Sequence, residues 1–361
     1  MTWLPAVIVL PYLILLLWIW FKLRKAQPFE LQPSRETSVS VIIACRNEEN
    51  NISALLRDIA AQDYPSHLFE VIVVDDNSDD LSFAVVARES FGLDLKLFRN
   101  NGSGKKEAIR TGVLNSSADF IITTDADCRV GKNWLRSIIS YNETVKADII
   151  ICPVVTNAGK GFTGRFQELE FLGLQAITAG TALAGNATMC NGANLAFSKA
   201  AYLYNSANLH FEINSGDDVF LLHSIKKQRD SRITWLESKD AIVRTDSEKR
   251  ISSFLNQRKR WISKSTYYKD NFTVLLGIVT FVTIAAQGVL MFASIFNHSF
   301  IIPFLLVLIL KSIPDWLLIK SAAVRYNIKT SMAWFLPAQL VYPIYLFILL
   351  IWPGQAADKR N

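Results

Sequence analysis

Hydrophobic and charged positions fall into long blocks along this chain. No charged residue precedes Lys22, and residues 4–21 are nearly all aliphatic or aromatic. Two further blocks without charge span residues 271–310, interrupted by Asn297-His298-Ser299, and residues 330–357. Because about 20 apolar helical residues cross a bilayer, the pattern predicts four transmembrane helices, one before and three after a polar middle.

Tryptophans near the ends of these blocks support the prediction, since aromatic side chains gather at membrane–water interfaces. The first block lacks a preceding basic residue and an Ala-x-Ala site, so we expect an anchor rather than a cleaved signal peptide. The expected organisation is an anchor over residues 1–25, a polar domain over 38–265 and three helices over 271–353. The tryptophans near the ends of the apolar blocks are Trp3, Trp18, Trp20, Trp316, Trp334 and Trp352.

Basic residues predict the orientation, because cytoplasmic loops carry an excess of Lys and Arg. Positive charges follow the first block, precede the second and separate the last two helices, whereas the tail residues Lys359 and Arg360 mildly disagree. We therefore expect a multi-pass protein of the cell membrane whose polar domain is cytoplasmic. The supporting residues are Lys22, Arg24, Lys25, Arg258, Lys259, Arg260, Lys264, Lys320, Arg325 and Lys329.

Short β-branched runs alternate with helical periods in the polar middle. The pattern predicts strands over residues 39–44, 69–74, 95–98 and 119–124, and helices over 50–61 and 105–115. Such alternation is typical of βαβ units. The expected fold class is α/β, with a Rossmann-like, mostly parallel sheet, combined with an α-helical transmembrane region.

Acidic residues follow three of these strands, at Glu48, Asp75–Asp76 and Asp125–Asp127. Ligands of parallel sheets bind at the carboxyl ends of the strands. The carboxylates of Asp125 and Asp127 can converge on one ion, and hard oxygen ligands suit Mg²⁺ or Mn²⁺, which can hold a diphosphate. A simple loop turn is the alternative, since Asp favours turns. The second acidic pair at a neighbouring strand end favours the nucleotide-diphosphate site.

Composition and missing motifs exclude other classes. Hydrophobic residues make up 50% of the 361 residues and charged residues 19%, which excludes a disordered chain. A net charge of +6 does not by itself indicate a nucleic-acid partner, and we expect none. The four cysteines stand apart without zinc-ligand spacing, and neither a GxGxxG nor a GxxxxGK[ST] motif occurs.

Six short motifs follow one another in the polar middle. They are VIIACRNEE at 41–49, VVDDNS at 73–78, GKKEAIR at 104–110, TDAD at 124–127, GDDV at 216–219 and QRKRW at 257–261. In this order they resemble a family 2 glycosyltransferase with the GT-A fold. The QxxRW motif is typical of membrane-embedded members, which include ceramide glucosyltransferases and polysaccharide synthases.

The resemblance implies a nucleotide-sugar site. Glu48 and either Asp75 or Asp76 would hydrogen-bond the nucleoside, and Lys105 would lie near the phosphates together with Asp125. For Asp76, an Asx turn that caps a helix stays open as an alternative. Lys106, the next residue of the helix, is expected to be exposed to solvent.

The resemblance also implies a metal and a base. Asp127, with Asp125 assisting, would hold the divalent cation, and Asp218 would be the general base of a reaction that inverts the anomeric configuration. Asp217 stands where the family usually has Glu, so either carboxylate of the pair can be the base, with Glu212 an outside candidate. For Asp217 the alternative is an acid at a helix N-terminus.

Acceptor contacts are expected further along the chain. Gln257, Arg260 and Trp261 would contact the diphosphate and the acceptor, and Asn194 is a weaker acceptor candidate. The alternative is a basic juxtamembrane helix on anionic lipid, which Arg258 would contact in either case.

Two apolar segments bear on the acceptor as well. The helix expected over residues 162–177 is either an ordinary core helix or one in the membrane interface that admits a lipid. Lys311 and Asp315 lie four residues apart inside an apolar block, and charges in such a place usually pair with each other.

These observations predict a metal-dependent, inverting glycosyltransferase of the hexosyltransferase type, bound to the membrane. It would move a sugar from a nucleotide-diphosphate sugar, most commonly a UDP-sugar in this family, to a lipid, a lipid-linked acceptor or a glycan. A processive polysaccharide synthase and a catalytically inactive sugar-nucleotide-binding scaffold are the alternatives. The sequence does not identify the sugar, the nucleotide base, the acceptor or the oligomeric state.

Overall fold

The computed structural model describes residues 4–32, 37–213, 216–328 and 332–353. These residues form two compact units. The sheet unit comprises residues 26–157 and 185–246, and the helical unit comprises the described parts of residues 1–25, 158–184 and 247–361. The predicted loop charge Lys329, the tail charges Lys359 and Arg360, and Trp3 lie outside the described residues.

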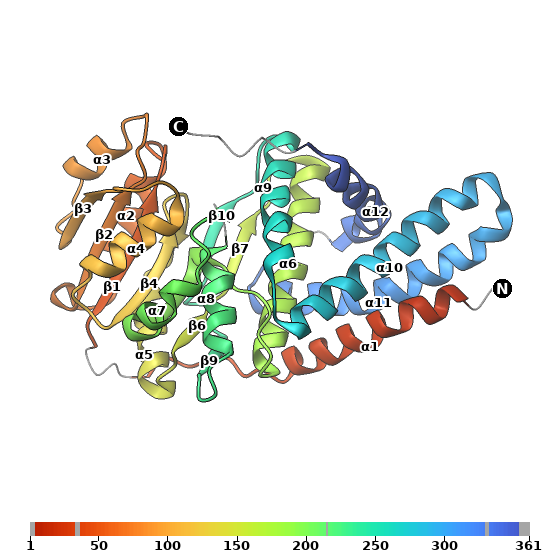
Figure 1. Ribbon diagram of the computed structural model, residues 1–361, viewed down its shortest axis with the longest axis horizontal. Helices are drawn as coiled ribbons and strands as arrows, with labels where there is room; N and C mark the ends of the chain where they lie inside the picture. Colours follow the sequence, from red (N-terminus) through yellow and green to blue (C-terminus); the bar gives the residue numbers. More distant parts are fainter. Residues whose placement is uncertain (1–3, 33–36, 214–215, 329–331, 354–361) are drawn as a thin grey trace. The chain divides into compact units, whose positions relative to one another are not determined.

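A seven-stranded sheet in the order β3-β2-β1-β4-β8-β6-β9 forms the centre of the sheet unit (Figure 1). The first four strands in this order are parallel, β8 runs antiparallel to both of its neighbours, and β9 is parallel to β6. The predicted α/β class with a mostly parallel sheet is therefore confirmed. The strands are β1 Val39–Cys45, β2 Phe69–Asp75, β3 Leu95–Arg99, β4 Phe120–Asp125, β6 Ile149–Ile151, β8 Leu195–Ser198 and β9 Ile233–Trp235.

The register of the central strands aligns their carboxyl ends. Cys45 of β1 pairs with Asp75 of β2, and Ala44 pairs with Asp125 of β4. The loops that follow β1, β2 and β4 consequently emerge side by side at one edge of the sheet. This edge carries the acidic residues singled out by the sequence.

Burial explains why these segments form the core. All seven residues of β2 and six of the seven in β1 are buried, as expected for parallel strands covered on both faces. Helix α2 buries Ile52, Leu55, Leu56 and Ile59, which recur at the spacing of one helical face. Helix α4 approaches β1 so closely that a Cβ on Gly112 would lie 2.4 Å from a methyl of Ile42.

The remaining elements of the sheet unit complete its layers. A small second sheet has the order β5-β10-β7, with β5 Arg129–Val130, β7 Val154–Asn157 and β10 Val243–Asp246. The helices of this unit are α2 Ile52–Ala60, α3 Ser82–Arg88, α4 Lys105–Asn115, α5 Trp134–Val145, α7 Lys199–Asn205 and α8 Asp217–Lys226.

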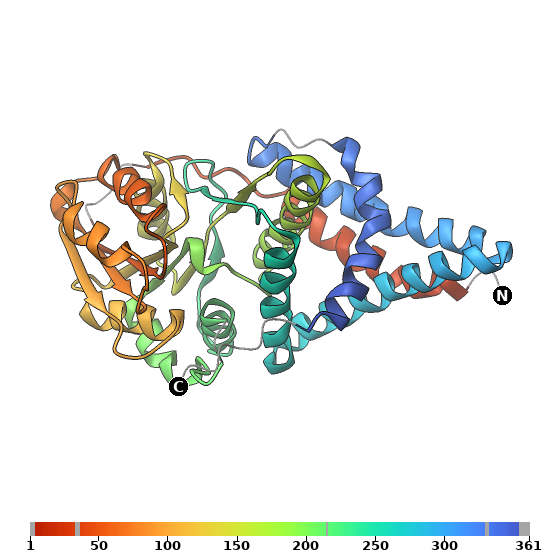
Figure 2. The same cartoon turned by 90° about the horizontal axis from the view of Figure 1, so that it is seen from above.

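Long helices make up the described part of the helical unit (Figures 1 and 2). Helix α1 packs against α6, α10 and α11, and a Cβ on Gly180 of α6 would lie 2.5 Å from a side-chain methyl of Ile19. The helices are α1 Leu4–Arg24, α6 Gly161–Leu183, α9 Ile251–Ser263, α10 Asn271–Phe296, α11 Ile301–Arg325 and α12 Phe335–Ile351.

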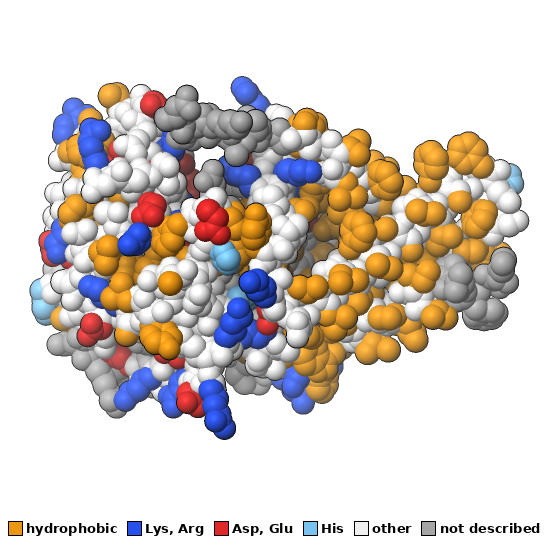
Figure 3. Space-filling view, viewed as in Figure 1, with side chains coloured by type: hydrophobic (Ala, Val, Ile, Leu, Met, Phe, Trp, Pro, Cys, Tyr) orange, Lys and Arg blue, Asp and Glu red, His pale blue; other side chains and the backbone are white. Residues whose placement is uncertain are grey.

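Four of the described helices, α1, α10, α11 and α12, are long and apolar enough to cross a membrane, and they coincide with the four predicted apolar segments. That they span a membrane stays a prediction. Hydrophobic side chains gather over the surfaces of α10 and α11 (Figure 3), where Phe292 is 64% and Ile302 is 73% exposed. Soluble surfaces rarely expose such continuous apolar area. The helices therefore indicate membrane association.

Helices α6 and α9 belong to the helical unit, although the sequence places both inside the expected domain of residues 38–265. Helix α6 packs against α1 and α11, so its apolar positions contact predicted membrane helices. The domain boundaries expected from the sequence stay a prediction.

Candidate functional site

The loops that follow β1 and β2 are tied together by short polar side chains. The backbone N–H of Asn47 donates to Ser78 Oγ at 3.0 Å, and Asn47 Oδ1 accepts from the N–H of Asp79 at 2.8 Å. Asn47 and Asn77 both have φ of 55°, in the left-handed region that asparagine tolerates better than most residues. These contacts position Glu48 and the Asp75–Asp76 pair.

Asp75 and Asp76 have different surroundings. Asp76 Oδ1 accepts hydrogen bonds from Asn100 Nδ2 and from the N–H of Gly104, both at 2.8 Å. Asp75 is 1% exposed, and its Oδ2 accepts from the N–H of Ser78 at 3.3 Å. Asp75, rather than Asp76, therefore makes the side-chain-to-backbone hydrogen bond of this turn, and the Asx turn left open as an alternative for Asp76 is not among the described hydrogen bonds. Asp75 Oδ1 has no hydrogen-bond partner among the described residues, so it is a buried acceptor that a ligand donor can satisfy.

Glu48 lies near the Asp125–Asp127 pair. Burial raises the pKa of its carboxyl above the ordinary value of 4.5, and the charges of Asp127 and Asp125 raise it further, against a hydrogen bond from Asn51. Since the charges of Asp125 and Asp127 act on Glu48, the loops that follow β1 and β4 form one acidic region. A cation or the donor groups of a ligand would lower this repulsion.

Lys105, the first residue of α4, forms an ion pair with Asp125. Burial alone would lower the pKa of its ammonium, but Asp125, Asp217 and Asp218 together hold it above its ordinary value. Three carboxylates from two separate sequence motifs therefore act on one lysine. The structure brings together the candidate base pair and the Asp125 motif, which lie about 90 residues apart in the sequence.

Asp127 continues the acidic region beyond Asp125. Burial and the neighbouring Asp125 raise the pKa of Asp127, and its Oδ2 lies 3.5 Å from Thr245 Oγ1 of the small sheet. No group of three or more His, Cys, Asp or Glu that could hold a metal occurs among the residues described. Two carboxylates nevertheless fit Mg²⁺ or Mn²⁺, because these ions are commonly held by one or two carboxylates plus substrate phosphates and waters.

The Asp217–Asp218 pair begins α8, directly after Gly216, which has φ of 90°. Asp218 Oδ2 accepts from the N–H of Gly192 at 3.0 Å, and its Oδ1 accepts from the N–H of Val219 at 2.8 Å. Two backbone donors thus orient this carboxylate. Asp217 also occupies the first turn of the helix, where the helix dipole favours an acid.

Gly192 is a site residue that the sequence reasoning missed. A Cβ at this position would lie 3.4 Å from both Asp217 Oδ2 and Lys105 Nζ, and 3.7 Å from Asp218 Cβ. The glycine therefore leaves open the space between the lysine and the acidic pair. The sequence signal that could have identified Gly192 is its position two residues before Asn194, which was already an acceptor candidate.

Lys106 and Asn194 differ from the expectations. Lys106 is 4% exposed rather than solvent-exposed, because its ammonium donates to the carbonyls of Leu209 and His210 at 2.8 and 2.7 Å. Asn194 is fully buried, donates to the carbonyls of Pro153 and Ala241, and accepts from Trp134 Nε1. These hydrogen bonds hold three segments of the sheet unit together, so we do not carry the acceptor role of Asn194 forward.

The QxxRW residues lie on α9, in the helical unit. Gln257 Nε2 donates to Glu248 Oε1 at 3.2 Å, Trp261 is half-buried and Arg260 is exposed. Arg258, expected to contact lipid, is instead 5% exposed and pairs with Glu170 at 2.5 Å. Burial alone would lower the pKa of Arg258, but the Glu170 carboxylate raises it. The roles of Gln257, Arg260 and Trp261 at the nucleotide site stay predictions.

The sheet topology and its acidic edge define an α/β domain of the GT-A-like type. The fold is similar to that of a mannosyltransferase from Pyrobaculum calidifontis, solved in complex with GDP-Man and Mn²⁺, with a TM-score of 0.59. The alignment covers 95% of this chain and 98% of that chain at 18% sequence identity. At this identity the likeness establishes the fold alone.

Residues 40–203 match the family described as Glycosyl transferase family 2. This segment, which holds Glu48, Lys105 and the Asp125–Asp127 pair, is therefore similar to family 2 glycosyltransferases. The family resemblance inferred from the six motifs is confirmed for this segment. The motifs at 216–219 and 257–261 lie beyond the match.

Curated relatives of known name match parts of the chain. The poly(ribitol-phosphate) β-N-acetylglucosaminyltransferase TarS of Staphylococcus aureus is 29% identical over 35% of this chain and 22% of its own length. The β-monoglucosyldiacylglycerol synthase of Trichormus variabilis is 28% identical over 40% of this chain and 33% of its own length. The chain thus spans a third or less of these relatives.

One relative aligns over a longer range. A dolichyl N-acetyl-α-D-glucosaminyl phosphate 3-β-D-2,3-diacetamido-2,3-dideoxy-β-D-glucuronosyltransferase of Methanococcus voltae is 23% identical over 86% of this chain and 92% of its own length. Because this alignment covers 86% of the chain, it extends well beyond residues 40–203, the segment that matches the family.

Proposed function

We propose that this chain is a membrane-bound, inverting glycosyltransferase that moves a hexose-type sugar from a nucleotide-diphosphate sugar to a hydroxyl of a lipid or lipid-linked acceptor. The observation that carries the proposal is a cluster at the carboxyl edge of the sheet, in which Lys105 pairs with Asp125 and lies beside Gly192 together with Asp217 and Asp218. Glycosyl transfer needs a stabilised diphosphate leaving group and a base for the acceptor hydroxyl. This cluster contains groups for both tasks.

Each residue has a distinct task in this proposal. The buried Asp75 Oδ1 and the carboxylate of Glu48 accept hydrogen bonds from the nucleoside, with Asp76 holding the loop through Asn100. Lys105 contacts the diphosphate, because its ammonium has the charge and reach for a phosphate oxygen. Asp218 takes the proton from the acceptor hydroxyl, since two backbone donors fix its orientation.

The divalent cation fits this arrangement. Asp127 would hold Mg²⁺ or Mn²⁺ with Asp125 assisting, and the bound ion would supply charge neutralisation at the diphosphate. The raised pKa of Asp127, caused by burial and by Asp125, reflects two neighbouring carboxylates whose charges lack full compensation. The mannosyltransferase of similar fold was solved with Mn²⁺ and GDP-Man, which supports the same assignment.

The lipid acceptor is supported by the helical unit and by the relatives. Four of the described helices are long and apolar enough to span a membrane. One relative is named a β-monoglucosyldiacylglycerol synthase, and another is named for transfer to dolichyl N-acetyl-α-D-glucosaminyl phosphate. We further propose that the sheet unit is cytoplasmic, since Lys22, Arg24 and Lys25 follow the first span. Gln257, Arg260 and Trp261 would contact the diphosphate or the acceptor from α9.

Release of nucleoside diphosphate tests the proposal. Membranes that contain the full chain are incubated with a panel of UDP- and GDP-sugars, with and without lipid extract and Mn²⁺, and compared with membranes that contain Asp218→Asn. We expect release that requires lipid and cation and is lost in the variant. Nucleotide binding without release from any donor, in the presence of lipid extract, would contradict an enzymatic role.

A further inference from the structure

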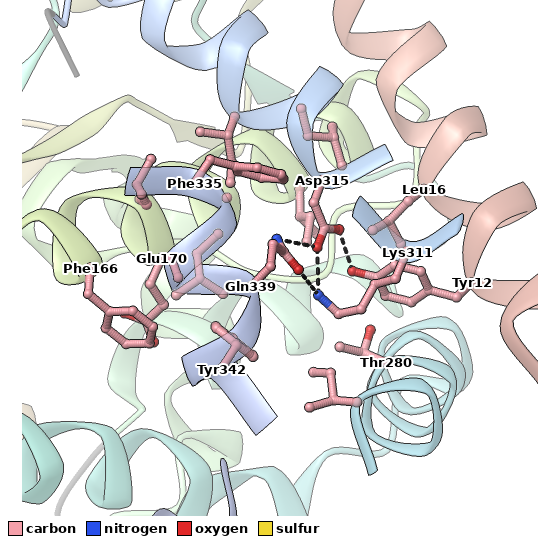
Figure 4. Close-up of a pocket in the computed structure, with 18 residues that line it drawn as sticks. Tyr12, Leu16, Phe166, Glu170, Thr280, Lys311, Asp315, Phe335, Gln339 and Tyr342 are labelled. Atoms are coloured by element: carbon pink, nitrogen blue, oxygen red, sulfur yellow. Dashed lines mark hydrogen bonds and ion pairs between the residues drawn. The ribbon is translucent and has the colours of Figure 1, made fainter. Parts of the chain in front are cut away.

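Four polar side chains meet among the long apolar helices of the helical unit (Figure 4). The Lys311 ammonium donates to Asp315 Oδ2 and to Gln339 Oε1, each at 2.7 Å, and Gln339 Nε2 donates to Asp315 Oδ2 at 2.9 Å. The Tyr12 hydroxyl donates to the second carboxylate oxygen of Asp315 at 2.6 Å. The predicted Lys311–Asp315 pair is thus confirmed. Ionisable residues this far inside apolar spans are costly and usually mark a functional site.

The cluster forms one wall of a cavity between α1, α6, α10, α11 and α12. The cavity has a volume of about 120 Å³, and its remaining lining is largely aliphatic, with Leu16, Leu174, Ile284 and Leu318 among the lining residues. On this measure a single water needs about 10–15 Å³. The cavity therefore has room for the polar end of a lipid, with several non-hydrogen atoms, but not for whole acyl chains.

A second polar group lies at the α6 side of the cavity. Glu170, which lines it, accepts two hydrogen bonds from Arg258 Nε, at 3.0 and 2.9 Å, and one from the Tyr345 hydroxyl at 3.1 Å. The charge of Glu170 is therefore neutralised by Arg258, as that of Asp315 is by Lys311. An entering phosphate would bring a negative charge next to two carboxylates, while Lys311, the one cation among the described lining residues, is already paired.

Two hydroxyl groups that line the cavity form no hydrogen bond with the described residues of the protein. Within the described part of the chain, the hydroxyls of Tyr342 and Thr280, which both line the cavity, form no hydrogen bond. Such groups can donate to and accept from neutral hydroxyls.

We propose that this cavity binds the neutral, hydroxyl-bearing end of a membrane lipid, with the Tyr342 and Thr280 hydroxyls as its hydrogen-bond partners. The inference rests on the proposed function, because it names the acceptor class as an uncharged lipid alcohol rather than a polyprenyl phosphate. A diacylglycerol and a ceramide both carry this chemistry, and their acyl chains would extend between the apolar helices.

Photolabelling tests the proposal on the purified full chain, in detergent and without any sugar nucleotide. The probes are a diacylglycerol and a ceramide with a diazirine in one acyl chain, competed by unlabelled diacylglycerol, ceramide or polyprenyl monophosphate. We expect labelled peptides from α6, α11 or α12, and competition by at least one neutral lipid but not by the polyprenyl phosphate. The neutral lipid that competes at the lower concentration, diacylglycerol or ceramide, is the one that the cavity binds more tightly.

Two substitutions make the assignment specific. Tyr342→Phe removes a hydroxyl, and Thr280→Val replaces a hydroxyl with a methyl group of similar size. Since one hydrogen bond contributes about 0.5–1.5 kcal/mol, each substitution should weaken labelling about 2- to 10-fold. Their melting temperatures should match the parent, because neither hydroxyl bonds to a described residue. Tyr204→Phe, at a position that is 80% exposed in the sheet unit, is the matched control and should change nothing.

Labelling that is equally strong in both variants, or competition by polyprenyl phosphate at a lower concentration than by either neutral lipid, would overturn the inference. The measurement needs no donor, so a failure of nucleotide release would leave the lipid result standing. Conversely, release that depends on polyprenyl phosphate would uphold the transferase and reject the neutral acceptor.

Discussion

Replacing Lys105 should weaken nucleotide binding strongly while it changes the stability of the fold only a little. The side chains of the Lys105–Asp125 pair are 35% and 33% exposed, and ion pairs in such settings contribute roughly 0–1 kcal/mol to stability. Lys105→Met should thus change the free energy of unfolding by about 1 kcal/mol or less. A charge-assisted hydrogen bond to phosphate contributes about 1.5–3 kcal/mol, so the Kd for nucleoside diphosphate should rise about 10- to 150-fold.

The same substitution should act in the opposite direction on the cation. In the absence of nucleotide the Lys105 ammonium pairs with Asp125, so it competes with a divalent ion for that carboxylate. Lys105→Met should therefore bind Mn²⁺ more tightly than the parent while it binds nucleotide more weakly. Isothermal titration calorimetry with Mn²⁺ alone, and with UDP or GDP in constant Mn²⁺, measures both effects.

Lys227→Met, which removes an exposed lysine just after α8, is the control and should resemble the parent in both titrations. Nucleotide affinity in Lys105→Met equal to that of the parent would refute the phosphate role. Weaker Mn²⁺ binding in the same variant would show that Lys105 does not compete for Asp125.

Three further predictions follow from the described contacts. Asp127→Ala should lose Mn²⁺-dependent nucleotide binding in calorimetry, and undiminished binding would remove its metal role. Asp218→Asn should retain nucleotide-sugar binding while turnover falls about 10²-fold or more, whereas a near-parental rate would move the base to Asp217. Glu70 is buried, which alone raises its pKa, but hydrogen bonds led by that of Lys96 lower it from 4.5 to about 2. The ionised Glu70 carboxylate therefore stabilises the fold by about 3 kcal/mol, at 1.36 kcal/mol per pKa unit. This stabilisation is complete above pH 4.5 and is lost as the pH falls toward 2. The melting temperatures of Glu70→Gln and the parent should consequently converge over that pH range.

Much of the fold follows from local patterns in the sequence. The predicted strands over 39–44 and 69–74 match β1 and β2 because parallel strands buried on both faces have continuous β-branched runs. The four long apolar helices follow from the length of the charge-free segments alone. The assignment of α6 could not be predicted, because its mixture of Phe, Leu, Glu and Arg suits either a soluble core or a membrane interface. Its packing partners α1 and α11 are distant in sequence.

Side-chain environments in the site depended on tertiary contacts that no local pattern reports. Lys106 follows Lys105 directly, and helical geometry alone predicted that it would point toward solvent. Its burial results from the carbonyls of Leu209 and His210, about 100 residues away, and from the face of the Phe220 ring, 4.6 Å from the ammonium. Lys106 consequently ties Leu209 and His210 to the helix that begins with Lys105. The two adjacent lysines therefore have complementary tasks, because Lys106 holds residues 209–210 in place while Lys105 faces the carboxylates.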